Sequence, residues 1–170
     1  MHVRRGHLEG AGLRLIGGIS AIMGSTVRLY TPIAIEEAVE VGIDVGEETF
    51  FAIFDCTVSR SGLDGVRVSH STFVASRCTI GDSARTGLRA EEGANIRLDG
   101  TTITSNEDGV VIGDSSILRN IVGLGPLSIT SNRSAGIRCA AAPAVPQLVG
   151  IAAGSVTGNP GGNFVSCPGY

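Results

Sequence analysis

The sequence of 170 residues contains no lysine and no tryptophan, and aromatic residues make up only 4% of it. Without lysine, the chain has no Schiff-base nucleophile, no phosphate-binding P-loop lysine and no lysine general base. With so few rings, it offers few platforms on which a sugar could stack. No stretch approaches the roughly 18 uncharged apolar residues of a membrane-spanning helix, so we expect no membrane insertion.

Charged and metal-binding residues are also sparse. Thirteen arginines stand against 16 acidic residues, which gives a formal net charge of −3. This balance provides no basic field, and we therefore expect no nucleic-acid partner. The histidines His2, His7 and His70 are scattered, and no CxxC or HxxxH spacing occurs. We expect neither a metal site nor a cofactor.

The N-terminus has one feature of an export signal, the basic start Met1–Arg5. The apolar run that follows, from Ala11 to Gly24, is interrupted by Arg14 and by four glycines. A signal peptide needs an apolar segment without such interruptions. We therefore interpret this run as folded chain rather than as a signal.

Glycine is abundant, with 25 residues, about twice its usual share of roughly 7%. Interior glycine disfavours a helical bundle, because each one costs about 0.5–1 kcal/mol relative to alanine. Five of the glycines open a short motif, in which a turn residue is followed by an apolar residue, any residue and a second apolar residue. Seven copies, spaced 22–27 residues apart, begin at Gly12, Ala38, Gly65, Gly87, Gly109, Gly136 and Asn163.

Two further apolar motifs complete each repeat. One precedes the glycine motif and begins at Cys56, Cys78, Thr101, Leu127 and Gly154. A looser apolar site falls at Phe73, Ile96, Ile117 and Leu148. Each repeat thus offers about three short strands with turn residues between them. Three strands in 22–27 residues form one coil of a solenoid, and coils must stack because none buries its apolar face alone.

The segments ITSNEDGVVI (103–112) and ITSNRSAGIRC (129–139) resemble the repeats of right-handed parallel β-helix proteins, the pectate-lyase-like superfamily. That group includes bacterial surface proteins with carbohydrate-binding and sugar-hydrolase-type repeats. The resemblance covers roughly Gly12 to Ser166. It implies an all-β fold, a single right-handed parallel β-helix of about six to seven coils. It leaves the activity open, because the same coil serves many functions.

Within this fold we expect residues 1–11 to form a lead-in and residues 12–170 to form the β-helix domain. Residues 12–54 repeat less regularly than residues 55–170. Two other solenoids are weaker alternatives. The LxLxxN pattern at 127–132 is typical of a leucine-rich repeat, but the other copies lack its leucines. The segments 79–87 and 110–117 resemble a left-handed hexapeptide helix, but no six-residue period is sustained.

Stacked coils bring equivalent positions about 4.8 Å apart, which is within reach of a disulfide. Cys56 and Cys78 occupy the same position of adjacent coils, and Cys139 and Cys167 lie one residue out of register in the last two. We therefore predict the disulfides Cys56–Cys78 and Cys139–Cys167, with free buried thiols as the alternative. The corner asparagines Asn106, Asn132 and Asn159 are expected to form a structural hydrogen-bonded ladder.

The middle residue of each glycine motif should point outward. This predicts a row of Arg14, Arg67, Arg89 and Arg138 on one face, interrupted by Glu40 and Val111. Such a row could bind the carboxylates of an acidic polysaccharide, or it could simply be a solvated sheet face.

Two carboxylates, Asp64 and Asp108, precede turn glycines two coils apart. Paired carboxylates suit glycoside hydrolysis, and with Arg67 and Arg89 they are the weak catalytic candidates of this chain. However, Asp-Gly is also an ordinary turn dipeptide. The acidic clusters and the Gly-His-Gly of the superfamily's enzymes are missing, since His70 lies in Ser-His-Ser.

These observations predict a non-catalytic extracellular or cell-surface module, structural or glycan-recognising, with polysaccharide as the possible ligand. The alternative is a lyase, hydrolase or epimerase that acts on an acidic glycan. Open coil ends expose unpaired backbone. We therefore expect the chain either to belong to a longer protein or to form a homo-oligomer.

Overall fold

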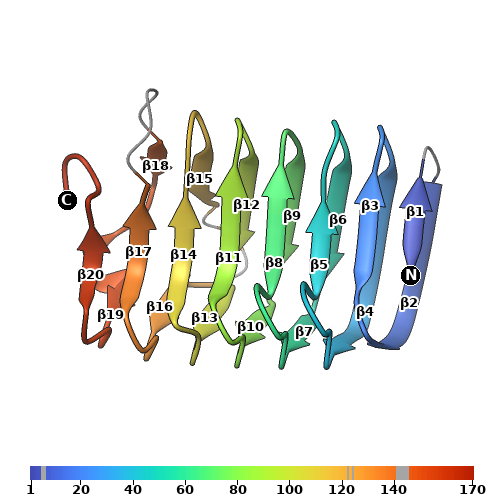
Figure 1. Ribbon diagram of the computed structural model, residues 1–170, viewed down its shortest axis with the longest axis horizontal. Coiled ribbons are helices and arrows are strands. Elements are labelled where there is room, and N and C mark those ends of the chain that lie inside the picture. The colour runs from blue at the N-terminus through green and yellow to red at the C-terminus, as the bar shows by residue number, and fades with distance from the viewer. Residues whose placement is uncertain (5–6, 122, 124, 141–145) are drawn as a thin grey trace.

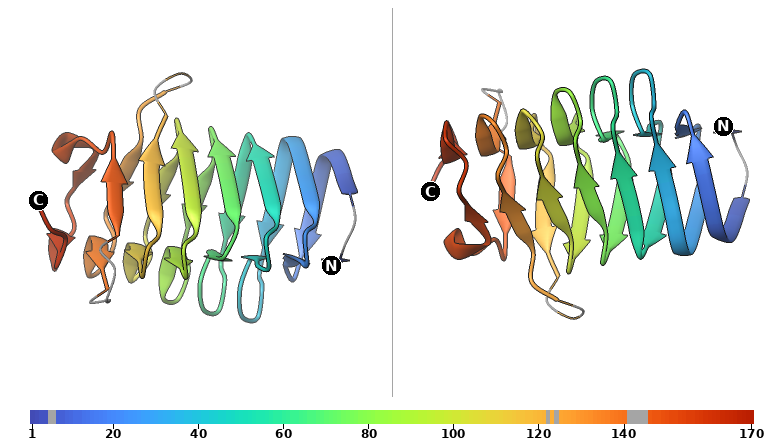
Figure 2. Two further views of the ribbon diagram at one scale, coloured as in Figure 1. Left: turned by 90° about the horizontal axis from the view of Figure 1, so that it is seen from above. Right: turned by 90° about the horizontal axis from the view of Figure 1, so that it is seen from below.

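The structure is a computed structural model that describes residues 1–4, 7–121, 123, 125–140 and 146–170, with only the backbone at 2–4, 7–16, 22 and 31. The chain forms a right-handed parallel β-solenoid of about six coils (Figure 1). Figure 2 shows the coils side by side from above and below. The predicted fold is confirmed.

The first sheet has eight parallel strands that lie side by side along the solenoid axis. They are β1 (His2–Arg4), β3 (Ile19–Ile22), β5 (Ile43–Val45), β8 (Val66–Ser69), β11 (Thr86–Glu91), β14 (Asp108–Ile112), β17 (Ala135–Cys139) and β20 (Gly162–Val165). This sheet faces the viewer in Figure 1.

The second sheet has 12 strands and bends at β4 (Thr26–Glu36), which pairs with β2 (His7–Ile16). Residues 26–29 of β4 pair with β6 and residues 33–36 pair with β7. The back arm contains β6 (Phe50–Phe54), β9 (Thr72–Ser76), β12 (Asn95–Asp99), β15 (Ile117–Asn120) and β18 (Gln147–Val149). The lower arm contains β7 (Cys56–Ser59), β10 (Thr79–Gly81), β13 (Thr102–Thr104), β16 (Ser128–Thr130) and β19 (Val156–Thr157). A 3-10 turn, η1 (Ala153–Ser155), precedes β19.

The core consists of apolar ladders, one along each sheet or arm. In the first sheet, the ladder of fully buried residues runs through Val66, Leu88, Val110 and Ile137. In the back arm, the corresponding ladder runs through Val27, Phe51, Phe73, Ile96 and Leu118. The sequence motif placed Ile117 in this ladder, and that was wrong, because Leu118 pairs with Ile96 while Ile117 pairs with Asn95.

Glycine opens the first-sheet strands because two neighbouring segments approach it closely. A Cβ at Gly87 would lie 2.6 Å from Cγ2 of Ile103 and 2.7 Å from the carbonyl oxygen of Gly109. No side chain tolerates contacts this short. The glycines at the equivalent positions, which are equally crowded, are Gly18, Gly42, Gly65, Gly109 and Gly136.

These equivalent glycines form a column along the first sheet, and the column shows that the first two copies of the sequence motif were placed in the wrong register. The strand partners of Val66 are Ile43 and, one coil earlier, Ile19, so the column begins at Gly18 and Gly42. The copies assigned to Gly12 and Ala38 were wrong. Gly12 lies in β2, which belongs to the second sheet, and Ala38 lies in the connection before β5. Both segments match the motif only because their apolar residues happen to fall at the same spacing.

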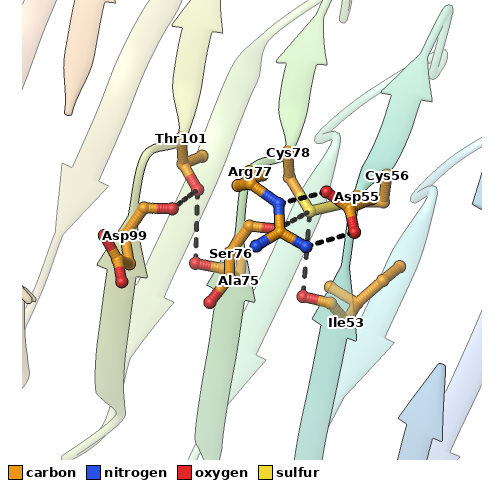
Figure 3. The surroundings of a disulfide bond; sticks show 9 residues. All are labelled: Ile53, Asp55, Cys56, Ala75, Ser76, Arg77, Cys78, Asp99 and Thr101. Carbon is orange, nitrogen blue, oxygen red and sulfur yellow. Dashed lines mark hydrogen bonds and ion pairs between the residues drawn. A yellow bond between two sulfur atoms is a disulfide. The ribbon is translucent and has the colours of Figure 1, made fainter. Parts of the chain in front are cut away.

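Two disulfides join neighbouring coils, as predicted. Figure 3 shows one of them, Cys56–Cys78, with its surroundings. Their Cα separations are 4.4 Å for Cys56–Cys78 and 4.9 Å for Cys139–Cys167. In the next coil after Cys78, Thr101 continues the column, and its hydroxyl donates to the carbonyl oxygen of Ala75 at 3.2 Å. The hydroxyl of Thr101 thus has a hydrogen-bond partner at the position where the two preceding coils carry the disulfide.

The corner asparagines form a continuous hydrogen-bonded ladder. Oδ1 of Asn132 accepts the backbone N–H of Asn106 at 3.1 Å, and Oδ1 of Asn159 accepts that of Asn132 at 3.0 Å. Oδ1 of Asn106 in turn accepts the N–H of Ser83 at 3.0 Å. The ladder ends there, because Oγ of Ser83 and Oγ of Ser61 are buried without a hydrogen-bond partner in the described structure.

We predict that Ser83→Asn extends the ladder by one rung. The new amide oxygen would accept the N–H of Ser61 beside Gly65, just as Asn106 does beside Gly87. One added buried hydrogen bond is worth about 1 kcal/mol, which raises the melting temperature by roughly 2–4 °C in a domain of this size. Thermal unfolding followed by circular dichroism measures this shift.

The reciprocal variant Asn132→Ser serves as the matched control, because it removes a rung of the same kind. It should lower the melting temperature by at least as much. A Ser83→Asn protein that melts at or below the wild-type temperature would contradict the proposed rung.

Candidate functional site

The outward face of the first sheet brings three of the four predicted arginines into one row. Arg67, Arg89 and Arg138 lie on β8, β11 and β17, with Val111 of β14 between the last two. Asp44 of β5 precedes Arg67 in this row. The middle position of the early copies was assigned to Arg14 and Glu40, and both assignments were wrong.

The physical reason is the shifted register of the first coils. Arg14 lies in β2, where it pairs with Ala34 of β4 in the second sheet, and only its backbone is described. Glu40 lies in the connection that leads to β5. The row therefore begins with an acidic residue rather than with an arginine.

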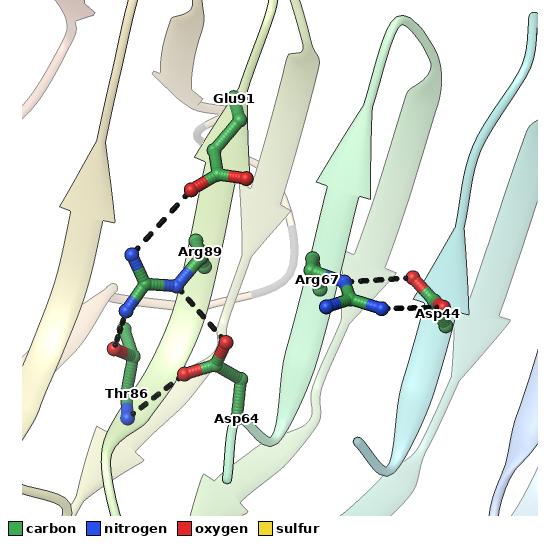
Figure 4. Close-up of polar contacts among 6 residues, drawn as sticks. All are labelled: Asp44, Asp64, Arg67, Thr86, Arg89 and Glu91. Atoms are coloured by element: carbon green, nitrogen blue, oxygen red, sulfur yellow. Dashed lines mark hydrogen bonds and ion pairs between the residues drawn. The ribbon is translucent and has the colours of Figure 1, made fainter. Parts of the chain in front are cut away.

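Arg67 is neutralised by its neighbour in the preceding coil (Figure 4). Its Nε and Nη2 atoms donate to the two carboxylate oxygens of Asp44 at 3.0 and 2.8 Å. This bidentate hydrogen bonding raises the pKa of Arg67 further above its ordinary value. A hollow of about 370 Å³ borders the pair and is lined also by Gly18, Ile19 and Val39.

Asp64 is the more buried of the two carboxylate candidates, with 4% of its surface exposed. Its Oδ2 accepts a hydrogen bond from Nε of Arg89 at 2.9 Å, and its Oδ1 accepts the N–H of Thr86 at 3.2 Å (Figure 4). Arg89 also donates to Oγ1 of Thr86 at 2.9 Å and lies 3.5 Å from Glu91. Asp64 and Glu91 thus both pair with Arg89, Asp64 from the preceding coil and Glu91 from the same strand.

Asp108 is held in the same way by the next coil. Its carboxylate accepts Nε and Nη2 of Arg138, both at 2.9 Å, and the N–H of Ala135 at 3.0 Å. Burial by itself would raise the pKa of Asp108, but the hydrogen bonds from Arg138 and Ala135 outweigh burial and lower this pKa below its ordinary value. The same pairing raises the pKa of Arg138.

The aspartate before the turn glycine thus has a repeated role. In both copies it accepts a backbone amide and an arginine side chain from the following coil. The structure brings Asp64 to Arg89 and Asp108 to Arg138, and it does not bring the two carboxylates together. An unpaired acid and base facing a common space, which glycoside hydrolysis requires, are not formed by these residues.

The sequence motifs missed a second set of arginines, on the outward face of the back arm. Arg97 of β12 and Arg119 of β15 are exposed and lie directly beside each other in the sheet. Within the described part of the chain, neither has an ion pair. The signal that could have found them is the apolar–Arg alternation in Ile96–Leu98 and Leu118–Asn120, which the misplaced Ile117 concealed.

Two further features are absent from the described residues. Among them, no group of three or more His, Cys, Asp or Glu side chains could hold a metal ion. No helix in the same part of the chain has the length and apolarity needed to cross a membrane.

Comparison with known proteins identifies the fold and little more. A family model described as "Right handed beta helix region" matches residues 34–142. No curated protein and no solved structure matches the chain.

We predict that Arg138→Gln raises the pKa of Asp108, because the burial that opposes ionisation remains while the arginine is lost. A carboxyl with a lowered folded-state pKa contributes stability above its unfolded-state value of about 3.9, and this contribution disappears as the pH falls through the folded-state value. The stability difference between wild type and variant should therefore be constant above about pH 5 and shrink below about pH 4.

Carboxyl ¹³C NMR titration and chemical unfolding at each pH measure these two effects. Arg60→Gln is the charge-matched control, because Arg60 pairs with Glu36 and Glu37 instead. If Asp108 titrates at the same pH with and without Arg138, the pairing does not set its pKa.

Proposed function

We propose that this chain, which belongs to the right-handed β-helix family, is a non-catalytic extracellular or cell-surface module. Its role is to provide a rigid scaffold whose faces are used for recognition. Members of one fold serve many functions, so the proposal depends on the sites of this chain rather than on its family.

The observation that carries the proposal is the pairing of the candidate catalytic groups. Asp64 and Asp108 each accept an arginine and a backbone amide from the next coil. A general acid or base must exchange protons with a substrate, and a nucleophile must be free to attack it. These carboxylates are instead used to join one coil to the next.

The two disulfides support a location outside the reducing cytosol. Disulfides persist in oxidising compartments and are rare in cytosolic proteins. Both of them, Cys56–Cys78 and Cys139–Cys167, join adjacent coils, so they also stiffen the scaffold.

The alternative is an enzyme that cleaves or epimerises an acidic glycan. For this function, Asp64 or Asp108 would have to leave its arginine in the working state. For Asp64 such a step would leave a nearly buried charge without its cation, which typically costs about 3–5 kcal/mol. The enzyme is therefore less favoured than the non-catalytic module.

We predict that Arg89→Gln destabilises the fold by about 3 kcal/mol, because the buried carboxylate of Asp64 loses its cation. Urea unfolding measures this change. Arg85→Gln is the matched control, because Arg85 is exposed and should change stability by less than about 0.5 kcal/mol.

The wild-type protein should release no reducing ends or unsaturated products from acidic or neutral polysaccharides. Product release that disappears in Arg89→Gln or Asp108→Asn would establish the enzyme instead of the scaffold.

We further predict that all four cysteines are oxidised in the native protein. Alkylation without reductant should leave the mass unchanged, and alkylation after denaturation and reduction should add four labels. The disulfides close loops spanning 22 and 28 residues, so reducing each one should lower stability by roughly 3 kcal/mol. Four labels on protein purified from an oxidising compartment would contradict this prediction and remove the argument for location.

A further inference from the structure

We propose that the outward face of the back arm is the surface through which two copies of this chain form a symmetric dimer. On this face, a column of carboxylates and a column of arginines run parallel to the solenoid axis, one on each side of a partly apolar strip. In the dimer, the carboxylates of each copy lie over the arginines of the other. This inference goes beyond the proposed function and holds whether or not the chain is an enzyme.

The first observation is that the arginine column lacks a counter-charge among the described residues. Arg97 and Arg119 are exposed, lie in register on adjacent parallel strands, and form no ion pair with any residue that the structure describes. The column continues through Val74 and Ala52 to Arg28. Like charges side by side destabilise a sheet, so carboxylates placed opposite them by another molecule are favourable.

The second observation is a column of carboxylates at the corner where the first sheet leads into the back arm. The turns of this corner lie along the top of Figure 1 and carry Glu48, Glu92 and Asp114. Glu48 and Glu92 are exposed. Oε2 of Glu92 lies 3.2 Å from Nδ1 of His70, which belongs to the coil between those of Glu48 and Glu92. These turns therefore place negative charge parallel to the arginine column.

The third observation is the strip that separates the two columns. Phe50, Thr72, Asn95 and Ile117 lie in register along it and are all partly exposed. A hollow of about 230 Å³ joins the strip to the acidic corner at Glu48. The strip lies two residues before the arginines, about 7 Å away along the strands, and two or three residues after the carboxylates. It therefore runs close to the midline between opposite charges.

This arrangement makes the face complementary to itself. A two-fold dimer presses the same face of both copies together. A two-fold axis parallel to the strands would place each charged column over its own equivalent. An axis along the strip, parallel to the solenoid, instead reverses the strands and keeps the order of the coils, so that carboxylates meet arginines. Because Glu92 belongs to the coil of Arg97, and Asp114 to the coil of Arg119, these charges also meet at the same level.

The size of the face indicates a weak dimer. Five coils along the axis and seven residues across it cover about 24 Å by 23 Å. The dimer would then bury roughly 1,100 Å² in total, which is below the standard size of about 1,600 Å² for stable interfaces. The outward face of the first sheet is a poorer candidate, because Arg67, Arg89 and Arg138 are already paired within the chain.

Sedimentation velocity of the full chain over about 5–300 µM tests the inference. The wild type should pass from monomer to dimer with a Kd of roughly 10–100 µM, and about 500 mM salt should favour the monomer because exposed charge pairs are screened. Arg97→Glu should weaken the dimer at least about tenfold, because carboxylates then meet at both symmetric contacts. Arg85→Glu makes the same charge change at an exposed residue of another corner and should dimerise like the wild type. All three proteins should melt at similar temperatures.

A charge swap tests the pairing itself. Glu92→Arg alone should also weaken the dimer at least about tenfold, because arginines then meet. An equimolar mixture of Arg97→Glu and Glu92→Arg should dimerise with a Kd within about threefold of the wild-type value, since both contacts between the two variants join opposite charges. A variant that is merely misfolded would not regain association in this way.

The inference is overturned if the wild type stays monomeric over this range, or if it forms oligomers larger than the dimer that a closed two-fold allows. It is also overturned if Arg97→Glu and Arg85→Glu associate equally, because the interface then lies on another surface. A mixture that is no more dimeric than its two components would likewise exclude the proposed pairing of Glu92 with Arg97.

Discussion

The parallel hydrogen-bonded register between coils is the constraint on which the rest of this protein depends. It sets each residue about 4.8 Å from its equivalent in the next coil, so side chains of the same character meet repeatedly. Apolar residues then fill a core that no single coil could enclose. The same register aligns the glycines, the corner asparagines and the cysteines, which is why a chain with few aromatic residues still forms a continuous interior.

The outward arginines also recur from coil to coil, but among the described residues they are ion-paired on the first sheet and not on the back arm. On the first sheet, Asp44, Asp64 and Asp108 neutralise arginines of the following coil and become part of the framework. On the back arm, Arg97 and Arg119 form no ion pair with any residue that the structure describes. An aspartate of the preceding coil therefore makes an outward arginine of the first sheet part of the framework that joins the coils.

The fold, the two disulfides and the asparagine ladder could be predicted from sequence because each depends on position within a regular repeat. In the first coils, prediction failed at Gly12 and Ala38, since chance alternation there imitates the motif while strand pairing places the glycine column at Gly18 and Gly42. The ion pairs of Asp64 with Arg89 and of Asp108 with Arg138 could not be predicted, because they join side chains from different positions of neighbouring coils. Such contacts depend on side-chain direction, which spacing alone does not determine.

The placement of the two disulfides makes the stack mechanically uneven. Cys139–Cys167 closes a loop that contains nearly the whole final coil, and Cys56–Cys78 closes one near the middle. A stretching force applied to the chain beyond Cys167 would not unfold the coil closed by Cys139–Cys167, because the S–S bond carries that force. The coils formed by β1 to β6 contain no disulfide and resist the same load with hydrogen bonds, packing and ion pairs such as Asp44–Arg67. Under tension, this solenoid would unwind from its N-terminal side first.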